Sequence, residues 1–461
     1  MVVVGIIQWR IGFIDNKAMM GETDSFYRLL AIQEYLKDGG SILLPFIKLP
    51  LEGVWLSGYF SIFIILGKIG FNEMGFRIFT WICGLLLVLL VWLIANRLIK
   101  KTGTLWWLLV LFTFAMSPLM MQVNFEMLGE PVMSFLLLVS LFFLLKEKQF
   151  WTIFFLFLSQ SIRYESWFIV PFFWIYIIYF IKSWSWKNKI VVLLGTLFFP
   201  LIWMILNSIQ NGNLLFFYSN RQFYLGLSPY SGNFFVALKE WVLRLQQYVS
   251  MEWFFLWIFG VICMFLGGHN KRKWWAAMSI YSFFIVVLQL WLNSTAWFAP
   301  RYIYMVFVLS VPVLLVAVEL IVKIYRQTNI VGKIIILLFF ISFTSQYIRG
   351  IPMTKTEVES YFIPNQEVKI LTDTLKNKSY TSNSEVFYLW LKDSPWLSAD
   401  FSYYLINRGV WKNVVSINNE VGLQKINKGS FLIAEKGLVE EGKEFSEILN
   451  DSYIFETWIR N

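Results

Sequence analysis

The strongest constraint on the fold is a succession of long apolar segments separated by short polar connections. A helix needs about 20 mostly apolar residues to cross the hydrocarbon core of a bilayer. The runs that reach or approach this length lie at 74–96, 104–121, 131–145, 150–162, 167–181, 190–207, 252–266, 274–292, 302–322 and 334–348. Residues 2–14 are predicted to be the outer half of a first span.

Composition agrees with a membrane protein and excludes several kinds of chemistry. Hydrophobic residues make up 58% of the chain and charged residues 15%, whereas a soluble domain carries roughly a quarter charged residues. The net charge is +10, but the basic residues form no stripe on a soluble face, so no nucleic-acid partner is expected. The sole histidine, His269, excludes Ser-His-Asp catalysis and paired-histidine metal sites. Cys83 and Cys263 lie in separate apolar runs, which excludes a disulfide framework.

The connections between the apolar runs alternate in charge. One set carries fourteen basic residues and a single acidic residue, Glu147, and comprises 97–101, 146–149, 182–189, 269–273 and 323–333. The other set, around 123–130, 163–166 and 293–301, holds only Arg163 and Arg301 as basic residues. The positive-inside rule makes the first set cytoplasmic. We therefore expect a cytoplasmic N-terminus and an exported C-terminal region in a multi-pass protein of the cell (plasma or inner) membrane.

These patterns predict an α-helical polytopic membrane protein with about eleven transmembrane helices. The transmembrane domain is predicted to span 1–348, with external loops at 15–73 and 208–250. Residues 349–461 carry 13 basic and 15 acidic side chains, so their composition differs from that of the membrane part. Strand-like runs alternate there with helix-like ones, which predicts a small extracytoplasmic α/β domain.

The first external loop contains an amphipathic segment. Apolar residues at 26, 29, 30, 32 and 36 mark one helix face, and Gly39 suits a left-handed end to that helix. Asp24 stands at the start, where it would cap the helix by accepting free N–H groups. A functional carboxylate is the alternative, because Glu22 lies two residues earlier and could point the same way.

Several segments together resemble the GT-C glycosyltransferases. They are the run Gly21 to Gly39, Lys48-Leu49-Pro50-Leu51, Asn72 to Arg77, Gly129-Glu130-Pro131, Arg163-Tyr164-Glu165-Ser166-Trp167, Asn211 to Tyr218 and Pro300-Arg301-Tyr302. Their order and spacing over about residues 5–320 are similar to those of protein mannosyltransferases and aminoarabinose transferases. Enzymes of these kinds take sugars from polyprenyl phosphates. This chain departs from the pattern at Leu49, where proline is usual, and at Thr23-Asp24, where the family has an acidic pair.

The resemblance implies an inverting hexosyl- or pentosyltransferase that moves a sugar from a polyprenyl-phosphate donor to a hydroxyl of a glycan, lipid or protein acceptor on the outer face. It implies Asp24 as general base, supported by Glu22. The residues it assigns to donor phosphate or sugar are Lys48, Glu130, Arg163, Glu165, Tyr218, Arg221 and Arg301. The resemblance implies no specific cofactor. It leaves open whether Glu22 and Asp24 bind a divalent cation.

Apart from Lys48, the donor-site residues also have a plainer interpretation. Arg163 and Glu165 would form a local ion pair, Arg301 would snorkel to the interface, and Glu130 would be an exposed loop acid. Tyr218 and Arg221 would belong to an interfacial aromatic belt with an arginine facing lipid phosphates. Ionisable groups near the membrane core are costly and usually functional, which favours the catalytic interpretation.

Two other functions fit part of the pattern. A flippase or transporter for lipid-linked sugar would need ionisable or Gly/Pro-broken sites near mid-membrane in both halves, whereas the ionisable groups here gather towards one face. An oligosaccharide ligase or polymerase of related architecture would use arginine-rich outer loops, whereas the short outer loops here hold single arginines.

The charge bias gives a direct prediction of topology. In a cysteine-free background, a cysteine at position 380 should react with an impermeant thiol reagent added to intact cells, because 349–461 is predicted to be exported. A cysteine at position 272 should react only after permeabilisation. The reverse labelling pattern would contradict the orientation.

Overall fold

The computed structural model describes residues 2–9, 23–50, 55–99, 105–219, 239, 248–267, 270–293, 300–344, 371, 386–390, 413–417, 431–435, 445–449 and 455–460. The chain forms two compact units. The first, here called the helical unit, contains Met1–Ala18 and Tyr35–Thr354. The second, the sheet unit, contains Met19–Glu34 and Lys355–Asn461.

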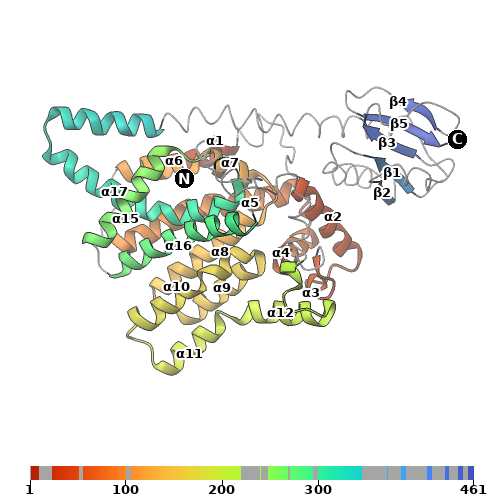
Figure 1. The fold of residues 1–461 in the computed structure, drawn as a ribbon, viewed down its shortest axis with the longest axis horizontal. Helices are drawn as coiled ribbons and strands as arrows, with labels where there is room; N and C mark the ends of the chain where they lie inside the picture. The colour runs from red at the N-terminus through yellow and green to blue at the C-terminus, as the bar shows by residue number, and fades with distance from the viewer. Residues whose placement is uncertain are drawn as a thin grey trace. The chain divides into compact units, whose positions relative to one another are not determined.

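Helices dominate the described part of the helical unit (Figure 1). In chain order the first helices are α1 (Val2–Trp9), α2 (Thr23–Lys37, across the unit boundary), α3 (Leu44–Ile47), α4 (Ser57–Lys68), α5 (Glu73–Ile99), α6 (Leu105–Ala115), α7 (Pro118–Phe125), α8 (Gly129–Leu145) and α9 (Gln149–Ile162). They are followed by η3 (Tyr164–Ile169), α10 (Val170–Ile175), η4 (Tyr176–Phe180), α11 (Trp186–Gly195), α12 (Phe198–Asn211), α15 (Met251–Gly267), α16 (Asn270–Asn293), η5 (Pro300–Ile303), α17 (Tyr304–Gln327) and an apolar helix at Ile330–Thr344.

Two described helices, Glu73–Leu98 and Arg301–Gln327, are long and apolar enough to cross a membrane. Two bent pairs raise this number to four if each pair is one span. Trp106–Ala115 and Pro118–Phe125 meet at 47°, and Trp186–Gly195 and Phe198–Asn211 meet at 40°. The apolar runs 104–121 and 190–207, each expected to be one helix, are therefore broken.

A local sequence signal accounts for the break between α6 and α7. Pro118 is the first residue of α7 and has no N–H to continue the hydrogen-bonding of α6. Ser117 caps the new helix, because its side-chain oxygen accepts a hydrogen bond from the backbone N–H of Met120 at 3.3 Å. This Ser-Pro pair ends one helix and starts the next at a new angle.

Helix α17 lies at the core of the helical unit and contacts α5, α6, α15 and α16 (Figure 1). Aromatic rings fill the junction with α15: the ring centroids of Trp253 and Phe307 lie 4.2 Å apart. The Trp253 indole N–H donates to Ser310 Oγ at 3.0 Å, so a buried polar group of α15 is satisfied by α17. Further along α15, Gly260 allows the backbones of α15 and α17 to approach closely, because a Cβ at this position would lie 2.4 Å from the Val313 carbonyl oxygen.

The described part of the sheet unit contains a mixed five-stranded sheet. Its strands are β1 (Val386–Trp390), β2 (Asn413–Ile417), β3 (Phe431–Glu435), β4 (Phe445–Leu449) and β5 (Phe455–Arg460), in the order β2-β1-β3-β5-β4 (Figure 1). β1 pairs in parallel with β2 and β3, and β5 pairs antiparallel with β3 and β4. Leu389 and Leu432 are fully buried, as expected for central strands with apolar side chains on both faces.

The predicted amphipathic helix of the first external loop is confirmed as α2. Gly39 follows it with φ +97°, and the Gly40 N–H donates to the Tyr35 carbonyl at 2.8 Å. This is the left-handed helix end that glycine favours. The helix begins at Thr23, so Asp24 lies within its first turn and not before it. An acidic residue there is favourable next to the partial positive charge of the helix N-terminus.

Gly260 offers a test of the α15–α17 junction. Gly260→Ala should lower the melting temperature of the purified protein, because the new Cβ would force two helix backbones apart, at about 1–3 kcal/mol for overpacking. Gly267→Ala is the matched control at the end of the same helix, where a Cβ meets nothing within 4 Å. Equal melting temperatures for both variants would contradict the close packing.

Candidate active site

A buried carboxylate and two arginines meet inside the helical unit. Glu130 Oε1 lies 2.8 Å from Arg163 Nη1 and 3.9 Å from Arg301 Nε. The Glu130 side chain is 2% exposed, and the arginine side chains are 16% and 8% exposed. Glu130 Oε2 has no hydrogen-bond partner among the described residues. The cluster therefore offers a buried acceptor oxygen beside two guanidinium groups.

Arg163 also holds a second carboxylate. Its Nε and Nη2 donate to Glu165 Oε2 and Oε1 at 3.1 and 2.6 Å, which is the two-pronged geometry that arginine forms with a carboxylate. The Ser166 hydroxyl donates to the Arg163 carbonyl at 2.8 Å. We call the residues Glu130, Arg163, Glu165 and Arg301 the charged cluster.

Local structure explains how the members of the charged cluster reach one another. Glu130 lies in the first turn of α8, where the helix dipole favours a carboxylate. Arg163 follows the last residue of α9 in extended conformation, with φ −153° and ψ 147°, so the chain leaves the helix at this residue. A Cβ on Gly129 would lie 3.2 Å from Arg163 Cγ and Cδ, which means that glycine gives the arginine its path across the start of α8.

The charges of this cluster stabilise one another. Burial alone lowers the pKa of Arg163, but the carboxylates of Glu130 and Glu165 outweigh burial and raise that pKa above its ordinary value. The guanidinium therefore keeps its charge. Removing one partner of a buried ion pair is costly, at about 3–5 kcal/mol, because the other charge stays buried.

A second set of polar contacts supports the cluster from α5, α7 and α17. Arg77 Nε donates to the Phe125 carbonyl at 2.9 Å, and the Thr80 hydroxyl contacts the Arg77 and Glu126 carbonyls at 2.8 and 3.1 Å. The Tyr304 hydroxyl donates to Asn124 Oδ1 at 2.6 Å. These bonds hold the end of α7 a few residues before α8 and the start of α17 three residues after Arg301.

An aromatic cluster lies beside Arg163. Leu56, Phe199 and Trp203 are buried at its centre, and Phe46, Leu49, Phe157, Tyr164, Trp167, Leu206 and Phe217 pack against them. The Tyr164 and Phe217 rings stack with centroids 4.9 Å apart, and the Trp203 indole N–H donates to Tyr164 Oη at 2.8 Å. The segments that contain Lys48, Arg163 and Tyr218 thus share one packing centre.

The remaining predicted site residues are placed differently or not described. The Lys48 amine is 3.7 Å from Asp38, and its carbonyl accepts a hydrogen bond from Tyr35 Oη at 2.7 Å. Tyr218 is half exposed. Glu22 and Arg221 lie outside the described residues. The structure describes the backbone of Asp24 but not its side-chain surroundings.

Burial decides between the sequence interpretations of three residues. Glu130 is buried, so its interpretation as an exposed loop acid is wrong. Arg301 is also buried and near Glu130, which excludes the snorkelling alternative. The local Arg163–Glu165 pair exists, but it is part of the larger cluster. Sequence reasoning did not single out Asn124 and Tyr304, although a polar Asn-Phe-Glu segment and a tyrosine shortly after Pro-Arg were visible signals.

No protein-family model matches the sequence, and no curated protein matches it. Solved structures do match the fold. ArnT from Cupriavidus metallidurans bound to undecaprenyl phosphate has a TM-score of 0.64 at 10% identity, over 99% of this chain and 96% of that one. Its apo state gives the same TM-score at 11% identity, with the same shares of both chains.

Archaeal proteins share the architecture as well. The oligosaccharyltransferase AglB from Archaeoglobus fulgidus, in complex with an inhibitory peptide and a dolichol-phosphate, has a TM-score of 0.54 at 10% identity, over 94% of this chain and 68% of that one. ArnT and AglB are GT-C proteins. The chain is therefore a mostly helical protein with the GT-C fold, and the expected fold resemblance is confirmed.

The two-pronged contact of Arg163 can be tested by a conservative change. Arg163→Lys keeps the charge but cannot bind Glu165 with two parallel hydrogen bonds, so we expect a loss of about 1–3 kcal/mol in the free energy of unfolding. Arg326→Lys, at an exposed helix end, is the matched control and should melt as the wild type does. A wild-type melting temperature for Arg163→Lys would show that the two-pronged contact between Arg163 and Glu165 contributes nothing to stability.

Proposed function

We propose that this protein transfers a hexosyl or pentosyl unit from a polyprenyl-phosphate donor to a hydroxyl acceptor on the outer face of the membrane, with inversion at the anomeric carbon. The observation that carries the proposal is the buried charged cluster within a GT-C fold. Support comes from the structural neighbours, because ArnT was solved with undecaprenyl phosphate and AglB with a dolichol-phosphate.

The topology belongs to this proposal. Long apolar helices and the likeness to GT-C membrane proteins support a membrane location. We propose about eleven crossings, with shorter and bent helices serving as spans. The basic loops then face the cytoplasm, and the charged cluster at the start of α8 faces outward.

The members of the charged cluster suit different roles. Arg301 is a buried cation in a segment that matches the family, and we assign it, with Lys48, to the donor phosphate. Charge-assisted hydrogen bonds to a phosphate are roughly twice as strong as neutral ones. Arg163 donates two hydrogen bonds to Glu165 and forms an ion pair with Glu130, so we assign Arg163 and Glu165 to positioning. Glu130 Oε2 can accept a hydrogen bond from a donor-sugar hydroxyl.

The reaction needs one proton acceptor. The acceptor hydroxyl attacks the anomeric carbon while the bond from that carbon to the phosphate oxygen breaks, and the polyprenyl phosphate leaves with the electron pair. We propose that Asp24 takes the hydroxyl proton as the new C–O bond forms, with Glu22 in support. Tyr218 and Arg221 would contact the lipid-linked sugar. A divalent cation on Glu22 and Asp24 is the alternative use of this acidic pair.

A pair of isosteric variants tests the assignment of the base. Asp24→Asn removes the proton acceptor, whereas its effect on α2 through the lost helix-end charge is limited to about 0.3–1 kcal/mol. Turnover should fall by a factor of about 10² to 10⁴. Glu22→Gln should have a smaller effect. The measurement is transfer of radiolabelled sugar from a polyprenyl phosphate to acceptors in a membrane extract, by the full protein in liposomes.

Each contrary result has a defined meaning. A near-normal rate for Asp24→Asn with an inactive Glu22→Gln would move the base to Glu22. Normal rates for both variants would rule out a mechanism in which Asp24 or Glu22 is the general base. Label that crosses the bilayer without transfer would identify a flippase and overturn the proposed function.

A further inference from the structure

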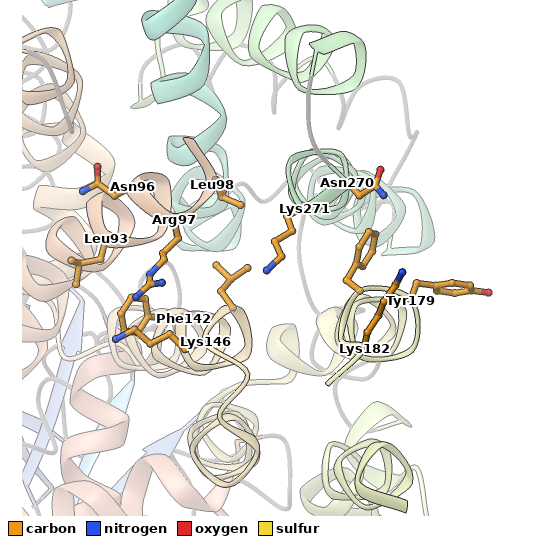
Figure 2. Close-up of a pocket in the computed structure, with 12 residues that line it drawn as sticks. Leu93, Asn96, Arg97, Leu98, Phe142, Lys146, Tyr179, Lys182, Asn270 and Lys271 are labelled. Carbon is orange, nitrogen blue, oxygen red and sulfur yellow. The ribbon is translucent and has the colours of Figure 1, made fainter. Parts of the chain in front are cut away.

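A cavity of about 830 Å³ lies among helix ends of the helical unit, away from the charged cluster. Its walls come from the last turns of α5 and α8, from η4 and from the start of α16 (Figure 2). Glu130 is near one end of α8, and the cavity includes Leu145 at the other end. This volume is in the range of cavities that hold small organic ligands.

Four cations line the cavity: Arg97, Lys146, Lys182 and Lys271. In the view of Figure 2, the Lys271 amine lies between the Arg97 guanidinium and the Lys182 amine. No lining residue among those that the structure describes is acidic. The nearby acid in sequence, Glu147, accepts a hydrogen bond from Ser183 Oγ at 2.5 Å. The cavity therefore holds an excess of positive charge.

The cavity also has an apolar wall. Leu93, Phe142 and Leu145 supply apolar surface beside the cations. Inorganic phosphate alone would leave the apolar wall uncovered.

Contacts around the cavity hold its walls in place. Arg272 Nε donates to the Leu98 carbonyl at 2.9 Å and so ties the start of α16 to the end of α5. Lys189 Nζ donates to the Ile178 carbonyl at 3.1 Å. The positive-inside rule explains why basic residues occur at this end of the helices. It does not require four of them to line one cavity beside an apolar wall.

We propose that this cavity binds the headgroup of an anionic phospholipid such as phosphatidylglycerol. The phosphodiester lies among the four cations, and the apolar wall contacts the adjoining lipid carbons. Basic cavities between helices at a cytoplasmic surface are suited to acidic lipid headgroups. This site is independent of the proposed transfer reaction.

The test is binding to the full-length protein, purified and stripped of lipid in detergent. Native mass spectrometry with added phosphatidylglycerol should detect one retained lipid, bound more tightly than phosphatidylcholine. The double variant Arg97→Gln, Lys271→Gln should bind phosphatidylglycerol about 25-fold more weakly, since each cation near a lipid phosphate contributes about fivefold. Arg326→Gln is the matched control, because Arg326, like Arg97, is in the last turn of a long helix but does not line the cavity.

Two further measurements keep the result decisive. Lys271→Arg keeps the charge and should keep the lipid, which separates the loss of charge from the loss of the lysine side chain itself. Glycerol 3-phosphate and inorganic phosphate should not displace the lipid. Wild-type binding by the double variant, or an equal loss with Arg326→Gln, would overturn the site. Displacement by inorganic phosphate at similar concentration would show a soluble-phosphate site and overturn the lipid assignment.

Discussion

The ion pair between Glu130 and Arg163 is the interaction on which the local architecture depends. A carboxylate as buried as Glu130 is tolerated only beside a compensating cation, because an unpaired buried charge costs several kcal/mol. Arg163 can reach it only where the chain leaves α9 in an extended conformation and where Gly129 leaves room. Helix α9 is therefore only 14 residues long, and the chain resumes as the tighter η3.

The aromatic cluster extends this arrangement to segments far apart in sequence. Tyr164 follows Arg163 directly, stacks on Phe217 and accepts a hydrogen bond from Trp203. Leu49, at a position where the GT-C glycosyltransferases that the sequence resembles often have proline, packs in the same cluster. Apolar packing thus holds the neighbours of Lys48, Arg163 and Tyr218 in fixed positions.

Local signals in the sequence predicted local features well. Gly39 after an amphipathic run predicted the left-handed end of α2, and the spacing of Arg163 and Glu165 predicted their ion pair. Hydropathy did not predict the bends, because the runs through Pro118 and Thr196 stay apolar while the helices break. Nor did it predict the Asn124–Tyr304 hydrogen bond, whose partners are 180 residues apart. Such contacts depend on helix packing, which periodicity does not encode.

The two ends of α8 differ in how their charged groups are arranged. At the start, two arginines face two glutamates, so the charged cluster has no net charge, and selectivity there must come from the direction of buried N–H groups. At the other end, about 24 Å away along the helix axis, four cations line a partly open cavity without a lining acid. Binding there would rest on net charge and would weaken as salt rises, whereas buried pairs are screened much less. A neutral, preorganised cluster suits a ligand that must be released after reaction, and an excess of charge suits one that stays bound.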